Sequence, residues 1–179
     1  MAEEVENLEI KQGNISLILD SYNDIFSSFD PRSYLERALS DDFLDECKRA
    51  ARDKDDAIEL RLLIPKDKRN LKEEWKIRKR LHDHFQHHVH LEGKEIMRLK
   101  WEGTSWFIFG TVCVLIVSYL HQVISPGFLL TLLGVLIEPA GWFSLWEGLG
   151  KIFITAREKS PGLEFYEKMS RAEINFAEY

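Results

Sequence analysis

The chain has 179 residues, of which 45% are hydrophobic and 30% charged, and its net charge is −6 at pH 7. These averages exclude a largely disordered chain, a collagen-like repeat and a disulfide-rich scaffold, and the acidic balance argues against nucleic acid as a partner. The averages hide a segregation, because residues 103–137 contain no Asp, Glu, Lys or Arg. The two cysteines, Cys47 and Cys113, lie in segments too different to predict a disulfide.

Residues 1–100 predict the first part of a mixed α and β domain. The acidic start lacks the positive and apolar regions of a secretory signal, so we expect the N-terminus to stay in the cytoplasm. Residues 14–19 have the apolar run of a buried strand, and residues 57–64 alternate apolar and polar side chains up to Pro65. Asp30 and Ser40 are typical residues of a helix start, which predicts short helices over residues 32–39 and 41–52.

A long helical pattern follows, beginning at Asn70 and Glu73, which have the spacing of a capping box. It continues toward residue 103, and Gly93 is a candidate position for a bend. His84 and His88, in a cluster of five histidines, lie one turn apart, which is the spacing of ligands for zinc or a similar ion. A solvent-exposed helix face that becomes charged near pH 6 explains the cluster more simply, and a pH-responsive gate is a third interpretation.

A basic segment on the same helix predicts a weak candidate site for an anion. The site would bind an anion or an acidic neighbouring subunit, although an ordinary solvent-exposed face explains the residues equally well. Its members are Lys76, Arg78, Lys79 and Arg80.

Two apolar runs, residues 103–124 and 127–150, predict a pair of transmembrane helices. A helix needs about 20 apolar residues to cross the hydrocarbon core of a bilayer, and each run is long enough. Ser125, Pro126 and Gly127 predict a tight turn between them, which makes a hairpin. A buried hairpin in a soluble protein is the alternative, but a part of ~100 residues is too small to enclose two apolar helices.

The charges that flank the runs predict the orientation of the hairpin. Lys and Arg precede the first run and follow the second, whereas the turn has none, so both termini are expected in the cytoplasm and the protein in the plasma or inner membrane. If the chain reverses near residue 125, residues whose numbers sum to about 251 have similar depth. A belt of aromatic residues then lies at the cytoplasmic interface, formed by Trp101, Trp106, Trp142 and Trp146.

Glu138 interrupts the second run about 16 Å from Gly127, near the middle of the bilayer. Pro139 follows it and frees a backbone carbonyl. One interpretation is a ring of carboxylates from several subunits that lines a cation or proton path, with His121 and Thr111 as further polar groups. The other is a protonated or hydrogen-bonded Glu that joins packed helices. Small residues suited to close helix packing and self-association are Gly110, Thr131, Gly134, Gly141 and Gly148.

Residues 151–179 are expected to complete the cytoplasmic domain. The pattern predicts a helix to about Lys159, a stop at residues 160–162, a short helix over residues 163–170 and a strand over residues 173–178. The last strand can join the first two. The predicted fold class is therefore an α+β cytoplasmic domain, with a small sheet of about three strands, into which a two-helix transmembrane hairpin is inserted.

The sequence contains no P-loop, GxGxxG, GxSxG or CxxC motif, so we expect neither an enzyme nor a cofactor. An acidic group could surround a divalent cation, but turn and cap roles explain its members, Asp20, Asn23, Asp24 and Asp30. The leading interpretation is a homo-oligomeric cation or proton channel with a cytoplasmic gating or assembly domain, whose partners are the lipid bilayer, copies of itself and ions. The alternative is a membrane-anchored interaction or signalling module whose hairpin only tethers and oligomerises it.

Overall fold

The computed structural model describes residues 14–52, 54, 59–124 and 127–179. They belong to two compact units, of which the first comprises Met1–His90 with Leu163–Tyr179 and the second comprises Leu91–Gly162. We call the first the sheet unit and the second the hairpin unit. The acidic start, the first two residues of the strand predicted over residues 57–64, and Ser125 and Pro126 of the predicted turn lie outside the described residues.

The sheet unit contains three parallel strands, β1 (Asn14–Ile18), β2 (Glu59–Ile64) and β3 (Glu173–Glu178), in the order β1-β2-β3. The connection from β1 to β2 contains the 3-10 helix η1 (Tyr22–Ile25) and the helix α1 (Asp41–Ala51). All remaining helices lie between β2 and β3: η2 (Lys66–Lys68), α2 (Leu71–Val123), α3 (Phe128–Gly150), the π-helical turn η3 (Lys151–Thr155) and α4 (Ala156–Arg171). The α+β class and the joining of the last strand to the first two are confirmed.

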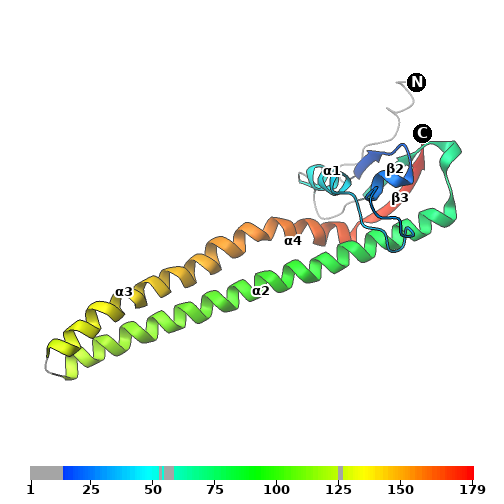
Figure 1. The fold of residues 1–179 in the computed structure, drawn as a ribbon. Helices are drawn as coiled ribbons and strands as arrows, with labels where there is room; N and C mark the ends of the chain where they lie inside the picture. Colours follow the sequence, from blue (N-terminus) through cyan, green and yellow to red (C-terminus); the bar gives the residue numbers. More distant parts are fainter. Residues whose placement is uncertain (1–13, 53, 55–58, 125–126) are drawn as a thin grey trace. The chain divides into compact units, whose positions relative to one another are not determined.

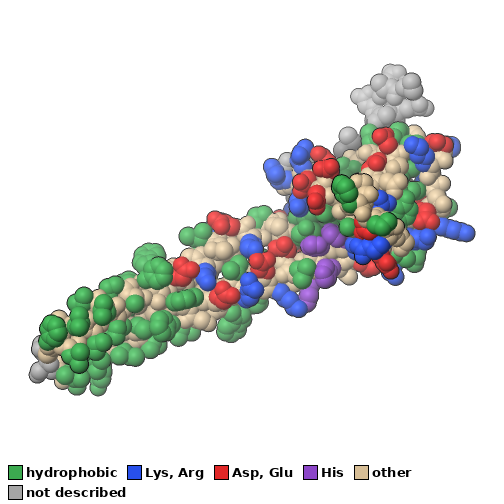
Figure 2. All heavy atoms as spheres, viewed as in Figure 1, with side chains coloured by type: hydrophobic (Ala, Val, Ile, Leu, Met, Phe, Trp, Pro, Cys, Tyr) green, Lys and Arg blue, Asp and Glu red, His purple; other side chains and the backbone are tan. Residues whose placement is uncertain are grey.

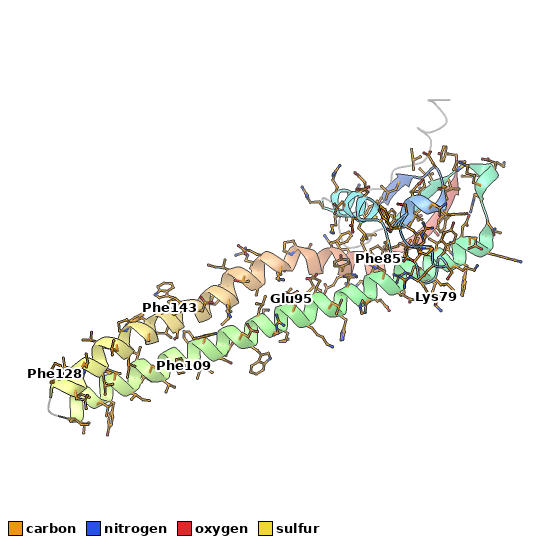
Figure 3. The ribbon with its side chains drawn as sticks, viewed as in Figure 1. Lys79, Phe85, Glu95, Phe109, Phe128 and Phe143 are labelled. Carbon is orange, nitrogen blue, oxygen red and sulfur yellow. The ribbon has the colours of Figure 1, made fainter. Side chains whose placement is uncertain are left out.

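One face of the sheet carries the hydrophobic core. Alternate residues of the strands, such as Ile15, Leu60 and Ile174, are buried, as expected when successive side chains point to opposite faces. Helical side chains cover them, and Figure 3 shows Phe85 of α2 in this crowded region. The helical part of the core includes Phe43 and Cys47 of α1, Ile77, Leu81 and Phe85 of α2, and Phe165 and Met169 of α4.

Residues 32–39 do not form the predicted helix but a series of turns. The carboxylate of Asp30 accepts hydrogen bonds from the backbone N–H groups of Arg32 and Ala38, at 3.1 and 2.7 Å. The guanidinium of Arg37 donates two further bonds to the backbone carbonyl of Ser27. These local bonds between side chains and backbone satisfy the groups that a helix would have used, so the turns prevail.

The predicted stop at residues 160–162 is also wrong, because α4 continues through Pro161 and Gly162. Both residues are exposed, so the proline ring has no packed neighbour to displace. Ala156 before them and Phe165 after them are buried. Packing on both sides thus outweighs the roughly 3 kcal/mol by which proline disfavours a helix interior. In the same way, α2 passes Gly93 without interruption.

The hairpin unit consists of the later part of α2 and of α3, η3 and the start of α4. The later part of α2 and α3 lie side by side (Figure 1). Buried positions recur every seven residues on both, at Gly103, Gly110 and Val117 on α2 and at Gly134, Gly141 and Gly148 on α3. Such a repeat keeps one seam of each helix against its partner.

Candidate functional site

The helices of the hairpin unit are in backbone contact at their glycines. A Cβ built on Gly110 would lie 2.5 Å from the carbonyl oxygen of Gly141, and one on Gly148 would lie 2.6 Å from that of Gly103. No residue larger than glycine fits there without moving a helix. Gly103 thus faces Gly148 and Gly110 faces Gly141, which is the register predicted from a reversal near residue 125.

The hairpin itself covers these glycines, as expected for residues that allow close helix packing, and the self-association predicted for the same set stays a prediction. Gly110, Gly141 and Gly148 meet the opposite helix of the same chain, and Gly134 is covered by the ring of His121. Thr131, predicted in the same set, is exposed, and its hydroxyl donates to the carbonyl of Gly127 in its own helix.

His121 and Glu138 lie next to each other across the hairpin. Nδ1 of His121 is 3.7 Å from Oε1 of Glu138, and the two side chains are 39% and 49% exposed. Counting from a reversal near residue 125 placed Glu138 at the depth of Thr111 and Cys113. Both residues are farther from the turn than His121 is. The difference arises because helical side chains point toward the N-terminus of their helix. Glu138 therefore extends toward the loop and His121 away from it, so they meet.

The remaining interior of the hairpin is apolar. The hydroxyls of Thr111 and Ser144 donate to carbonyls one turn earlier in their own helices, those of Phe107 and Ala140, at 2.8 and 2.7 Å. A small cavity of about 160 Å³ between the helices is lined by Cys113, Ile116, Val117, Leu120, Leu130, Leu133, Gly134 and Ile137. Neither feature provides a polar path through a single hairpin.

Pro139 lies inside α3, which continues without a break. Its missing N–H leaves the carbonyl of Val135 without the usual helical donor. Pro139 is exposed on the hairpin surface, beside the exposed Glu138.

The predicted interfacial tryptophans all point outward from the hairpin. Trp101 and Trp146 are both 68% exposed, and Trp106 and Trp142 are also exposed. Beyond them, ion pairs join the two arms of the hairpin unit, from Lys151 to Glu102 at 3.3 Å and from Lys159 to Glu95. The hydrogen bond from Lys159 lowers the pKa of Glu95. The apolar part of the hairpin thus ends in tryptophans and then in paired charges.

A second candidate site lies in the sheet unit, where three helices enclose a cavity of about 460 Å³. We call it the histidine cavity. Its lining comes from two residues that precede α1, from α1 itself, from α2 and from α4: Ala38, Leu39, Asp41, Leu44, Asp45, Lys48, Arg80, His84, His87, His88 and Tyr166.

His84 is the central side chain of the histidine cavity. Its Nε2 atom is buried and has no hydrogen-bond partner among the described residues. Its ring is 4.4 Å from that of His88, which in turn stacks on Tyr166 at 4.8 Å between ring centroids. Burial, assisted by the charges of His88, Arg80 and His87, lowers the pKa of His84 from 6.5 to about 4. At neutral pH the site therefore contains a neutral imidazole with a free nitrogen.

The pair His84 and His88 does not amount to a metal site. A stable site for zinc needs three or four protein ligands. No group of three or more His, Cys, Asp or Glu side chains among residues 14–52, 54, 59–124 and 127–179 could hold a metal ion. The described part of the chain therefore does not add a third ligand to the pair.

The four side chains of the predicted basic segment have different partners. Lys76 pairs with Glu73 at 3.0 Å, and Lys79 lies over the ring of Trp75. Arg78 donates to the carbonyl of Ile174 in β3, and Arg80 donates to that of Arg37. Of the four, Arg80 is a lining residue of the histidine cavity.

The acidic group near the end of β1 is used for turns and caps. Asp24 and Ser21 form a capping box at η1, and the carboxylate of Asp30 is bonded to Arg32. The side-chain oxygen of Asn23 accepts from Arg37 at 2.7 Å, and the backbone carbonyl of Asp20 accepts from Lys68. The turn and cap interpretation accounts for these contacts.

Sequence reasoning missed a buried polar network around Glu74, which is 3% exposed. Its carboxylate accepts hydrogen bonds from the hydroxyl of Tyr22 at 3.0 Å and from Arg69 at 2.9 and 3.0 Å. The Tyr22 hydroxyl also accepts the backbone N–H of Asn70. A charged residue in a helical pattern is normally assigned to the solvent face, and its partner Tyr22 is 52 residues away.

Comparison of the chain with protein-family models, with curated proteins and with solved structures found no match. The function is therefore argued from the geometry of the two units.

Proposed function

We propose that the hairpin unit spans a lipid bilayer. The carrying observation is that both helices are long and apolar enough to cross a membrane, while only 17% of the most apolar 18-residue window of each is buried. A core helix of a soluble protein would bury most of that window. Figure 2 shows hydrophobic side chains gathered over the visible face of the hairpin.

The exposed apolar side chains lie on both helices of the hairpin and include neighbouring positions such as Leu115 and Ile116. Phe109 and Phe143, labelled in Figure 3, are 55% and 66% exposed on opposite helices. Soluble proteins seldom expose an apolar surface of this extent, whereas lipid tails cover it without cost. The exposed set also includes Tyr119, Leu129, Val135 and Leu136.

Within this membrane protein, the geometry favours an anchored binding module over a channel. In the hairpin unit, α2 and α3 meet at facing glycines, and the small cavity between the two helices is apolar. Both features suit a rigid tether. The sheet unit, in contrast, holds a cavity of ligand size with an unpaired buried nitrogen. The sheet unit would bind the ligand and the hairpin would keep it at the membrane.

Cysteine labelling tests the span and its orientation. With Cys47 and Cys113 each replaced by alanine, single cysteines are introduced by Gln122→Cys, near the end of α2, and by His82→Cys, in the sheet unit. An impermeant maleimide should label the first on intact cells and the second only after permeabilisation. Release of the chain from membranes by alkaline carbonate would contradict the proposal.

A second function, a cation or proton path, is favoured by one observation, the pair of titratable groups His121 and Glu138 at 3.7 Å. Proteoliposomes loaded with a pH-sensitive dye test it. Proton flux should be lost in Glu138→Gln and retained in Glu147→Gln, a matched control beside Lys151 at the charged end. Absence of flux in the unmodified protein would exclude the path, and equal flux in Glu138→Gln would exclude a role of the carboxylate.

A further inference from the structure

The histidine cavity gathers nitrogen donors whose hydrogen-bonding capacity is not used up. Nε of Arg80 donates to the carbonyl of Arg37 at 2.9 Å, but no carboxylate of the described residues forms an ion pair with its guanidinium. Lys48 donates to the carboxylate of Asp45 at 3.4 Å, and the two side chains are 46% and 67% exposed, so the ammonium has further donors available. His84 adds the buried Nε2 atom that lacks a partner within the described part of the chain.

The start of α1 adds to this set. Ala38, Leu39 and Asp41 line the cavity at the N-terminal end of α1, and Ser40, the N-cap, makes no side-chain hydrogen bond to the first turn. The first N–H groups of a helix are unpaired within the helix and attract anions. Together with the guanidinium of Arg80, they provide the donors that recognise the oxygens of a phosphate.

The cavity also contains acceptors and room for more than an ion. The carboxylates of Asp41 and Asp45 line the same space and accept hydrogen bonds from hydroxyl groups. The volume of about 460 Å³ is many times the ~30 Å³ of one water, so an organic group fits beside the phosphate. A simple cation is disfavoured by Arg80 and Lys48. A simple anion would make no use of the Asp41 carboxylate or of the part of the Asp45 carboxylate that Lys48 does not engage.

We infer that the histidine cavity binds a small phosphate ester that carries hydroxyl groups, such as a sugar phosphate. Arg80 and the start of α1 would hold the phosphate, His84 would pair its free nitrogen with the ligand, and Asp41 and Asp45 would accept the hydroxyls. The inference rests on the proposed role of the sheet unit as a binding module, and it does not depend on the membrane span.

Calorimetry on the full chain in detergent tests the inference, with ribose 5-phosphate as the probe. Ribose 5-phosphate should bind more tightly than inorganic phosphate or ribose, because only the ester uses both the donors and the carboxylates. Arg80→Gln should weaken binding about tenfold or more. Lys79→Gln is the matched control, since the neighbouring Lys79 lies over Trp75 and not at the cavity. Asp45→Asn, at the exposed rim, should weaken the ester and leave inorganic phosphate unaffected.

Three results would overturn the inference. The first is a dissociation constant for ribose 5-phosphate weaker than about 1 mM, which corresponds to little specific recognition. The second is equal weakening by Lys79→Gln, which would indicate attraction by net charge alone. The third is equal affinity for ribose. Because Arg80 also bonds to the backbone, Arg80→Lys is measured in parallel, and it should stay folded with reduced affinity. If the chain resists extraction from membranes by carbonate and yet fails to bind ribose 5-phosphate, that result would contradict the ligand inference and would leave the proposed membrane anchor unaffected.

Discussion

Glu74 shows how much a single buried carboxylate contributes to the sheet unit. It is the acceptor for both Tyr22 and Arg69, so Glu74→Ala would leave a buried hydroxyl and a guanidinium without a partner. We expect a loss of about 3 kcal/mol in the free energy of unfolding. Thermal unfolding followed by circular dichroism measures it. Glu73→Ala breaks a more exposed pair with Lys76 and should cost less than about 1 kcal/mol. Equal losses in the two variants would contradict a special role of Glu74.

The same carboxylate predicts a loss of stability in acid. Burial by itself would raise the pKa of Glu74, but the hydrogen bonds from Arg69 and Tyr22 outweigh burial and lower it from 4.5. The folded chain therefore binds the proton less readily than the unfolded chain. The stabilisation is complete above pH 4.5 and declines as the pH falls toward the lower pKa of the folded state. The melting temperature of Glu74→Gln should change less with pH below 4.5 than that of the unmodified chain.

His84 acts in a different pH range. Its pKa falls from 6.5 in the unfolded chain to about 4 in the fold, so between these values the unfolded chain holds a proton that the folded chain lacks. The free energy of unfolding should therefore decrease as the pH falls from 6.5 to about 4. Melting temperatures at pH 7.5 and 5 measure this change. His84→Gln should reduce the difference, whereas His82→Gln, on the exposed face, should not. An unchanged difference in His84→Gln would contradict the assignment.

At the scale of the element, the contact between α2 and α3 depends on glycine. A Cβ on Gly110 would meet the carbonyl oxygen of Gly141 and the backbone nitrogen of Leu145, and neither can rotate away. Gly110→Ala should therefore lower the stability of the hairpin by about 1–3 kcal/mol. Gly93→Ala is the control within α2, because nothing lies within 4 Å of its Cβ, and it should stabilise the helix by about 0.5–1 kcal/mol. The stabilities of the two variants are compared by unfolding each protein, in a mild detergent, with increasing amounts of a denaturing detergent. If the Gly110→Ala variant were as stable as the unmodified chain, α2 and α3 would not be in backbone contact at Gly110.

Periodicity in the sequence predicted the elements where neighbouring positions decide the structure. The strand at residues 173–178 and the pairing of Gly110 with Gly141 follow from alternation and from counting along two helices. It failed at residues 32–39, where the side chains of Asp30 and Arg37 compete for the backbone, and at Pro161, where packing decides. Both outcomes depend on contacts with residues elsewhere in the chain, which the helix propensity of the local sequence does not take into account.

The candidate sites were predictable only in part. The sequence marked Glu138 and His121 as polar residues in an apolar run, but not that their side chains extend toward each other. It marked the spacing of His84 and His88, but not Tyr166, which stacks on His88 from a helix near the other end of the chain. The lining of the histidine cavity is assembled from three helices, so no local pattern reveals it.

At the scale of the whole molecule, the hairpin unit is inserted into the sheet unit. The central strand β2 pairs with β3, and the hairpin lies between them in the sequence. The sheet therefore acquires its third strand only after the entire hairpin has been synthesised. Pairing across so long a separation is slow to form, because the entropy of closing the loop must be lost first.

The insertion predicts that the sheet unit folds without the hairpin. The chain enters and leaves the hairpin unit at His90 and Leu163, and nearby the rings of His88 and Tyr166 stack at 4.8 Å. A linker of about eight Gly and Ser residues, whose mean span is roughly 16 Å, should therefore replace residues 91–162 without strain. The product should be a soluble, cooperatively unfolding protein that still binds ribose 5-phosphate, as measured by circular dichroism and calorimetry. A further deletion of residues 173–178, which form β3, should abolish cooperative unfolding. If the linker protein itself unfolds without cooperativity, the sheet unit depends on the hairpin and the insertion is more than a tether.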